Sequence, residues 1–125
     1  MKIVIGTAQF DPNYGIVRDK KNFNLKLKSN LLRTANKFKI NTIDTAVSYK
    51  NAENQLGKIG VNRFKIITKL PKFPDTCIDV ISWVKEQVHA SLTRLGVEQL
   101  RGILLHYPYQ LHEAKGEELW SALQI

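Results

Sequence analysis

Short apolar runs alternate with amphipathic stretches along the whole chain. The runs at residues 3–5, 41–45, 64–69 and 103–105 are rich in β-branched or aliphatic residues, which predicts four short strands. The last run lacks polar alternation, a pattern typical of a fully buried strand. Between the runs, apolar residues recur at spacings of three and four, which predicts helices. The pattern therefore predicts four consecutive strand–helix units.

Two of the predicted helices have clear apolar faces. The first face comprises Leu27, Leu31, Ala35 and Phe38, and we expect Lys28, Arg33 and Lys37 to lie elsewhere on the helix surface. The second comprises Ile78, Ile81, Val84, Val88, Leu92 and Leu95, and Gly96 is its predicted end. Shorter helices are expected near residues 51–58 and from about residue 116. Turn-forming residues predict a loop at residues 11–15.

Strands that are joined by helices pair in parallel, because a parallel connection needs a crossover. We expect the strand order 1-2-3-4 with the helices on one side. The pattern shows no linker, so residues 1–125 are predicted to form a single domain. Periodicity alone leaves two architectures open, an open doubly wound sheet and one half of a (β/α)8 barrel.

Composition excludes several classes of protein. One cysteine among 125 residues allows neither a disulfide framework nor a cysteine-based structural zinc site, and the histidine spacing predicts no metal site. The sequence contains neither a membrane-spanning apolar stretch nor a signal-peptide core, so we expect a cytoplasmic protein without a membrane partner. The net charge of +8 favours anionic partners. Because the basic residues are scattered and no nucleic-acid motif accompanies them, we interpret them as solvated and expect no nucleic-acid partner.

Four polar residues lie at or just beyond the carboxyl ends of predicted strands: Asp44, Tyr49, Lys69 and His106. In parallel α/β folds, ligands and catalytic groups gather at that edge of the sheet. Each residue also has a structural interpretation, because Asp44 could cap a helix, Lys69 could be a solvated strand end and His106 could be structural. Taken together, they predict that an acid, a phenol, an amine and an imidazole converge on one site.

Longer motifs surround these four residues throughout the chain. They are Gly6-Thr7-Ala8-Gln9-Phe10, Ile43-Asp44-Thr45-Ala46-Val47-Ser48-Tyr49, Asn51-Ala52-Glu53, Leu56-Gly57, Ile67-Thr68-Lys69, Ser91-Leu92-Thr93-Arg94-Leu95-Gly96-Val97 and Leu104-Leu105-His106-Tyr107-Pro108. In this order and at this spacing, the chain resembles the aldo-keto reductase family. The opening motif is similar to the branch associated with sugar and polysaccharide metabolism.

The resemblance implies a (β/α)8 barrel that binds NADPH or NADH and reduces a small carbonyl substrate, such as a sugar derivative. It implies that Tyr49 is the general acid and that Lys69 eases its proton release, since an ordinary tyrosine pKa is about 10. Asp44 would orient Lys69 and touch the nicotinamide ribose, and His106 would hydrogen-bond the carbonyl oxygen. Gly6 and Thr7, with Asp44, would be the cofactor-binding residues. No metal is implied.

Two features depart from the family pattern. Lys50 follows Tyr49 where family members usually have glycine, which suggests either an anionic substrate or a site no longer tuned for the usual chemistry. A complete barrel takes about 250 residues, so the resemblance covers only the amino-terminal half, without the phosphate-binding segments. We therefore expect the chain to be inactive alone. The alternative is a catalytically dead half-barrel that serves as an interaction or assembly module.

An open half-barrel would expose two strand edges and its inner face. We expect the side chains facing the barrel interior to include Ile3, Ile5, Ile43, one of Ile66 and Ile67, and one of Leu104 and Leu105. Exposed edges and apolar side chains favour association. The expected partner is a second copy of the chain or a missing carboxyl-terminal half.

Overall fold

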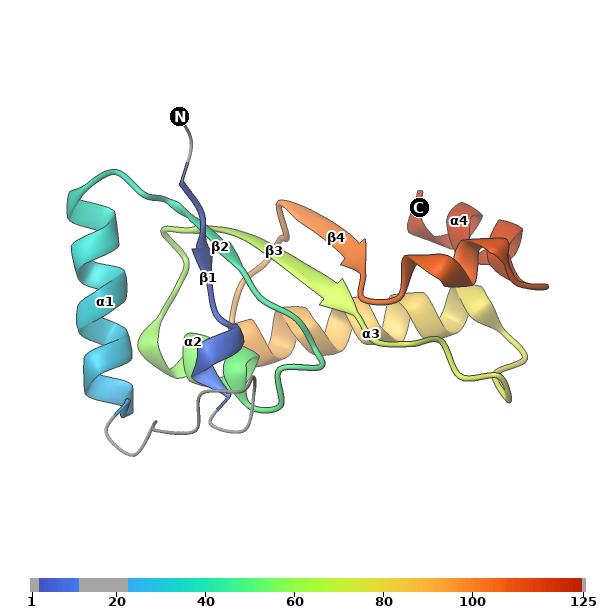
Figure 1. Cartoon of the computed structure of the whole chain (residues 1–125), viewed down its shortest axis with the longest axis horizontal. Coiled ribbons are helices and arrows are strands. Elements are labelled where there is room, and N and C mark those ends of the chain that lie inside the picture. The colour runs from blue at the N-terminus through green and yellow to red at the C-terminus, as the bar shows by residue number, and fades with distance from the viewer. Residues whose placement is uncertain (1–2, 12–22, 125) are drawn as a thin grey trace.

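The computed structural model describes residues 3–11 and 23–124 (Figure 1). Of the loop predicted at residues 11–15, residues 12–15 lie outside the described residues. The elements in chain order are β1 (Ile5–Gly6), the 3-10 helix η1 (Ala8–Phe10), α1 (Leu25–Lys37), β2 (Thr42–Asp44), α2 (Ala52–Ile59), β3 (Lys65–Leu70), α3 (Val80–Leu95), β4 (Gly102–Leu105), the 3-10 helix η2 (Pro108–His112) and α4 (Gly116–Leu123). Among the described residues, none of the helices has the length and apolarity needed to cross a membrane.

The four strands form one parallel sheet in the order β1-β2-β3-β4. The register pairs Ile5 with Ile43 and Ile43 with Ile66 across the first three strands. The predicted strand order and parallel pairing are confirmed. This arrangement is the amino-terminal half of a (β/α)8 barrel.

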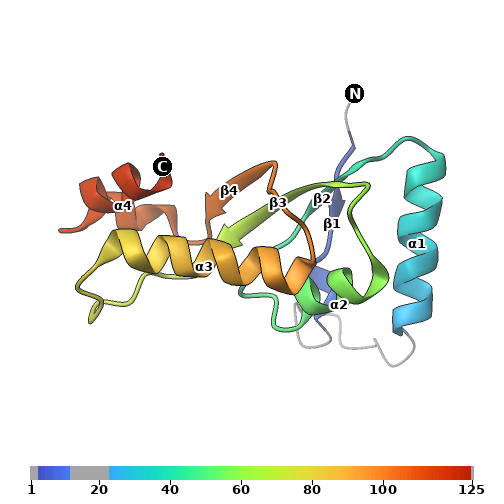
Figure 2. The same ribbon diagram turned by 180° about the vertical axis from the view of Figure 1, so that it is seen from behind.

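Burial alternates along the strands, so the two faces of the sheet differ. Ile43, Ile66, Thr68 and Leu70 are at most 1% exposed, and the apolar members of this set pack in cores that include residues of all four helices. Figure 2 shows α2 and α3 in front of the strands, on the face they cover. By register and alternation, the opposite face carries Val4, Gly6, Thr42, Asp44, Lys65, Ile67, Lys69, Gly102 and Leu104. We call this surface the open face, because no element of the described part of the chain covers it.

The register corrects part of the predicted barrel interior. Ile5 and Ile43 point toward the helices, where Ile43 is fully buried and Ile5 packs against the same core. Of Ile66 and Ile67, it is Ile67 that lies on the open face, and of Leu104 and Leu105 it is Leu104. A strand pattern has period two, and one residue of offset exchanges the two faces, so only pairing with neighbours decides the choice.

The predicted apolar face of α1 was wrong at three of its four residues, and only Ala35 is buried as expected. Leu27, Leu31 and Phe38 are 45%, 40% and 76% exposed, whereas Lys28 and Leu32 are buried. The Lys28 ammonium donates hydrogen bonds to the Phe10 carbonyl (3.1 Å) and the Gln55 side-chain oxygen (2.6 Å).

The same ammonium lies 5.2 Å from the ring centroids of both Phe10 and Phe23. Burial lowers the pKa of Lys28 below its ordinary value, because desolvation penalises the charged amine. The apolar stem of Lys28 and these contacts allow a lysine to lie between α1 and its neighbours.

Two smaller expectations also differ from the structure. Ile78 precedes α3 and is 90% exposed, because Asp79 caps the helix and Val80 begins it. Strand β4 is not fully buried, since Leu104 is 48% exposed on the open face. The predicted end of α3 is confirmed at Gly96, which adopts the left-handed conformation with φ 65°.

Candidate functional site

The carboxyl ends of β2, β3 and β4 bring Asp44, Lys69 and His106 to one end of the sheet. Lys69 forms an ion pair with Asp44, and its ammonium also donates to the Thr45 carbonyl at 3.0 Å. The two paired residues lie on the open face because the register places Asp44 opposite Ile67, two positions before Lys69. His106 continues the ladder, since its amide donates to the Leu70 carbonyl at 3.0 Å.

Tyr49 completes the cluster from the loop between β2 and α2. Its side chain is buried, with the Lys69 ammonium 5.3 Å from the ring centroid. The His106 ring meets the Tyr49 ring edge-on, with centroids 5.9 Å apart. All four residues that the sequence singled out therefore lie together, and we call them the quartet.

Gly6 and Thr7 lie beside Asp44 in different ways. Gly6 is exposed on the open face, and a Cβ placed there would meet no atom within 4 Å. Thr7 is fully buried, and both its hydroxyl and its amide donate to the Asp44 carbonyl at 3.0 Å. Thr7 thus positions the Asp44 backbone, whereas Gly6 leaves space for a ligand next to it.

Two buried polar atoms have no hydrogen-bond partner within the described part of the chain: the Thr45 hydroxyl and the His106 Nδ1. Buried polar atoms are normally paired, so His106 retains the capacity to bond a ligand atom beside Tyr49. Together with the space at Gly6, this fits the nicotinamide end of a cofactor and a carbonyl group. The described residues include no cluster of three or more side chains suited to a metal ion.

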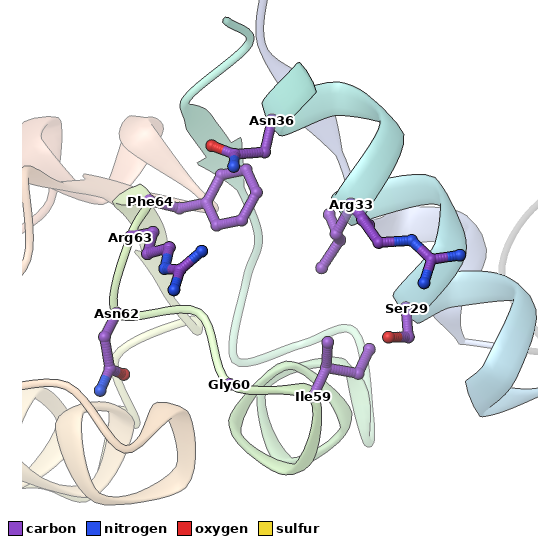
Figure 3. Close-up of a pocket in the computed structure, with 9 residues that line it drawn as sticks. Ser29, Arg33, Asn36, Ile59, Gly60, Asn62, Arg63 and Phe64 are labelled. Atoms are coloured by element: carbon purple, nitrogen blue, oxygen red, sulfur yellow. The ribbon is translucent and has the colours of Figure 1, made fainter. Parts of the chain in front are cut away.

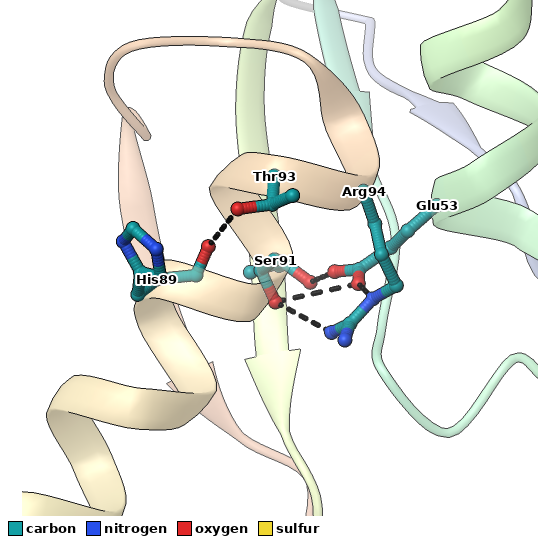
Figure 4. A network of polar contacts seen from close by, with 6 residues as sticks. Glu53, His89, Ser91, Thr93 and Arg94 are labelled. Atoms are coloured by element: carbon teal, nitrogen blue, oxygen red, sulfur yellow. Dashed lines mark hydrogen bonds and ion pairs between the residues drawn. The ribbon is translucent and has the colours of Figure 1, made fainter.

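Glu53 organises a polar network behind the quartet, although the sequence analysis named it only as a member of a motif. Its side chain is 2% exposed and accepts hydrogen bonds from Thr68 (2.7 Å), Ser91 (3.3 Å) and Arg94 (2.7 Å). Figure 4 shows Ser91 and Arg94 of α3 converging on this carboxylate from α2. The network fixes β3 against both helices one residue before Lys69, and thereby supports the position of the ammonium.

Lys50 occupies an unusual backbone conformation, with φ 41°. Non-glycine residues rarely enter this left-handed region, because Cβ approaches a carbonyl oxygen. A glycine would suit the position without strain. The positive φ explains why glycine suits this position and shows that Lys50 is strained there. Composition alone could not reveal this strain.

A separate pocket of about 390 Å³ lies between α1 and the loop that joins α2 to β3. Figure 3 shows the Arg63 side chain reaching into it and the Arg33 side chain turning outward along α1. Phe64, on its wall, precedes the first residue of β3, so this pocket is at the opposite end of the sheet from the quartet. It contributes nothing to the arrangement around Tyr49.

Comparison with known proteins agrees with this architecture. The model of the aldo/keto reductase family matches residues 2–125. The chain belongs to the aldo/keto reductase family. No curated protein matches its sequence.

Two solved structures of proteins assigned as aldo-keto reductases, both from Pseudomonas aeruginosa, have a similar fold. One has a TM-score of 0.73 and the other 0.70, and each is 22% identical over 97% of this chain. The aligned region covers 50% and 48% of the respective solved chains. This member of the family thus spans about half the length of the solved structures that it matches.

Proposed function

We propose that the quartet is the proton-transfer centre of an NADPH- or NADH-dependent carbonyl reductase that acts on a small carbonyl compound, such as a sugar derivative. The supporting observation is the joint position of Asp44, Lys69, Tyr49 and His106 at the carboxyl ends of the strands. Family membership supports the same chemistry.

In this proposal the Tyr49 hydroxyl donates a proton to the carbonyl oxygen of the substrate. The Lys69 ammonium stabilises the resulting phenolate through Coulomb attraction, and Asp44 and the Thr45 carbonyl hold that ammonium in place. His106 offers an unpaired ring nitrogen for hydrogen bonding to the substrate. When bound, the reduced nicotinamide supplies the hydride that adds to the carbonyl carbon, so hydride and proton together give the alcohol.

A second candidate function is an interaction or assembly module without catalysis. The open face favours it, because Leu104 and Ile67 expose apolar surface where a partner could pack. The strain at Lys50, next to the proposed acid, is a further point in its favour.

Binding of reduced nicotinamide mononucleotide to the ¹⁵N-labelled chain separates the two candidates. The reductase proposal expects amide shifts at Gly6, Asp44 and His106, and weaker shifts in the Lys69→Met variant. The matched control is Arg63→Ala, in the pocket at the opposite end of the sheet, which should leave the shifts unchanged. Shifts confined to that pocket, or no shifts at millimolar probe, would favour the module.

A further inference from the structure

The pocket between α1 and the connection from α2 to β3 has the chemistry of an anion-binding site. Figure 3 shows its two walls, with α1 on one side and residues 59–64 on the other. The walls lie on the helical side of the sheet, because Leu32, Ile59 and Phe64 pack in or against the buried core there. Two consecutive strand–helix units thus form the pocket, which lies apart from both the open face and the quartet.

Arg63 supplies a positive charge inside the pocket. Its side chain reaches into the space between the walls (Figure 3), and no other described residue forms a hydrogen bond or an ion pair with its guanidinium. Arg33, on the opposite wall, turns outward and donates to the Asn30 side chain at 2.9 Å. A guanidinium carries five N–H donors in a fixed fork, so Arg63 is suited to a bidentate contact with an oxyanion.

The walls of the pocket contain no negative charge that could neutralise Arg63. Neither α1 nor residues 54–74, which include the second wall, contain aspartate or glutamate. Cations that gather around a concave site raise the local concentration of anions. The formal net charge of +8 acts in the same direction. A ligand that complements this pocket is therefore an anion.

Two further donors favour a phosphate group over a carboxylate. Ser29 and Asn36 line the same pocket, and Figure 3 shows both side chains extending from α1 toward the opposite wall. Neither side chain forms a hydrogen bond within the described part of the chain. With Arg63, donors from three side chains face one space. A phosphate monoester presents three strong acceptor oxygens to them, whereas a carboxylate presents two.

We propose that this pocket binds a small phosphate monoester whose organic part is an aromatic ring. Arg63 would hold two phosphate oxygens, and Ser29 and Asn36 would bond the third. The volume of about 390 Å³ lies in the range of about 300–1,000 Å³ that is typical of small-molecule sites, so space remains beside the phosphate. Apolar walls that include Ile59 and Phe64 border that space, and the Phe64 ring can stack with an aromatic ring.

Titration of the ¹⁵N-labelled chain with phenyl phosphate tests the proposal. The largest amide shifts should occur at Ser29, Gly60 and Arg63. The Kd should be at least about tenfold lower than that for inorganic phosphate, because contact with the ring adds to contact with the phosphate. Benzoate has the same ring on a carboxylate and should bind at least about tenfold more weakly than phenyl phosphate. Equal binding of benzoate, shifts only outside this pocket, or no shifts at millimolar probe would each overturn the proposal.

Replacement of Arg63 separates a built site from general attraction to a basic chain. Arg63→Gln removes the guanidinium and should raise the Kd for phenyl phosphate at least about tenfold. Arg101→Gln is the matched control, because Arg101 is also exposed, lies outside this pocket and contributes the same charge. It should change the Kd less than about twofold at about 0.15 M salt, where distant charges are screened. Equal effects of the two variants would show diffuse attraction and contradict the site.

Phe64→Leu tests the aromatic part of the ligand separately. Leucine keeps apolar volume against the core but removes the ring, so the Kd for phenyl phosphate should rise about threefold or more. The Kd for inorganic phosphate should stay unchanged, and unchanged amide positions away from the pocket verify the fold. A Kd for phenyl phosphate that Phe64→Leu leaves unchanged would contradict an aromatic ligand.

Discussion

At the scale of single residues, adjacent residues of β3 belong to different faces of the sheet. Lys69 lies on the open face beside Tyr49, whereas Thr68, the residue before it, points to the helices and donates to Glu53. One strand thus joins the proposed site to a buried carboxylate through adjacent residues. The position of the Lys69 ammonium therefore depends on a buried network on the other face of β3.

Replacing Glu53 with alanine should lower the free energy of unfolding by about 2–4 kcal/mol, since it leaves the partly buried Arg94 guanidinium and two buried hydroxyls without their acceptor. Urea unfolding measures the loss. Glu98 is an exposed glutamate in the loop before β4 and serves as the control. Glu98→Ala should change the free energy of unfolding by less than about 0.5 kcal/mol. Equal effects of the two variants would show that the network does not stabilise the fold.

Replacing Lys50 with glycine should stabilise the fold, in contrast to the loss expected for Glu53→Ala. The left-handed conformation costs a non-glycine residue about 1–2 kcal/mol, and the flexibility of glycine in the unfolded chain offsets about 0.5–1 kcal/mol of the relief. Lys50→Gly should therefore raise the free energy of unfolding by about 0.5–1 kcal/mol in the same assay. Lys50→Ala keeps the strained conformation and should bring no gain. If alanine stabilises as much as glycine, the lysine charge rather than the backbone is responsible.

At the scale of elements, close packing between α2 and α3 positions the loop that carries Tyr49. A Cβ at Gly57 would lie 2.1 Å from the Arg94 backbone carbonyl oxygen, well inside contact distance. The two helices therefore approach each other only because this residue has no side chain. The approach also brings Glu53 within reach of Arg94.

Gly57→Ala should destabilise the fold by about 1–3 kcal/mol, because the backbone oxygen cannot move aside as a flexible side chain would. Thermal or urea unfolding provides the measurement. Gly102→Ala is the control, because a Cβ there meets no atom within 4 Å, and its effect should stay within about 0.5 kcal/mol. A neutral Gly57→Ala would mean that the helices separate without cost.

The start of α3 depends on a titratable cap. The Asp79 carboxylate accepts from the Ser82 amide (2.9 Å) and hydroxyl (2.7 Å), and these bonds hold its pKa below the ordinary value. A lowered folded-state pKa stabilises the fold above the unfolded-state pKa of about 3.9, and that contribution disappears as pH falls through the folded value.

Asp79→Ala should therefore lower the urea midpoint at neutral pH, and its difference from wild type should vanish in acid below the folded-state pKa of Asp79. Asp75→Ala is the control. The Asp75 side chain is 81% exposed and lies 3.8 Å from Lys72, so it should alter the midpoint little at any pH. A difference for Asp79→Ala that persists in strong acid would assign the effect to helix propensity rather than to the charged cap.

At the scale of the whole molecule, the described sheet corresponds to half of a barrel, and the proposed reaction uses more than a proton donor. General acid catalysis contributes about 10²–10⁴-fold, whereas fixing the reactants against each other accounts for about 7–11 kcal/mol. The phosphate site common to this fold is built after strands seven and eight, and the described sheet has four strands. We therefore expect the proposed reaction to require the second half of a barrel.

The 125-residue chain by itself should show no carbonyl reduction above background when NADPH absorbance is followed with a panel of aldehydes. Tyr49→Phe removes the proposed acid, and Tyr109→Phe alters a tyrosine that is 79% exposed and outside the quartet. Turnover by the wild type that is lost in Tyr49→Phe and retained in Tyr109→Phe would show that the half-barrel alone holds the cofactor productively.

The sequence by itself determined the order of elements and the residues of the quartet. Apolar periodicity and glycine stops are local signals, so β2, β3 and the end of α3 could be predicted closely. Asp44, Lys69 and His106 follow predicted strands, and parallel pairing brings strand ends to one edge without further information. Tyr49 lies in the loop just beyond the second predicted strand, so the same argument places it at that edge.

Only the tertiary structure decided which side of each element is buried. On α1 the burial of Lys28 rather than Leu27 depends on the carbonyl of Phe10 and the amide of Gln55, which are distant in sequence. The choice between Ile66 and Ile67 depends on register. The strain at Lys50 depends on backbone geometry that no periodicity encodes. Contacts between distant segments set these features, and a local pattern contains no information on them.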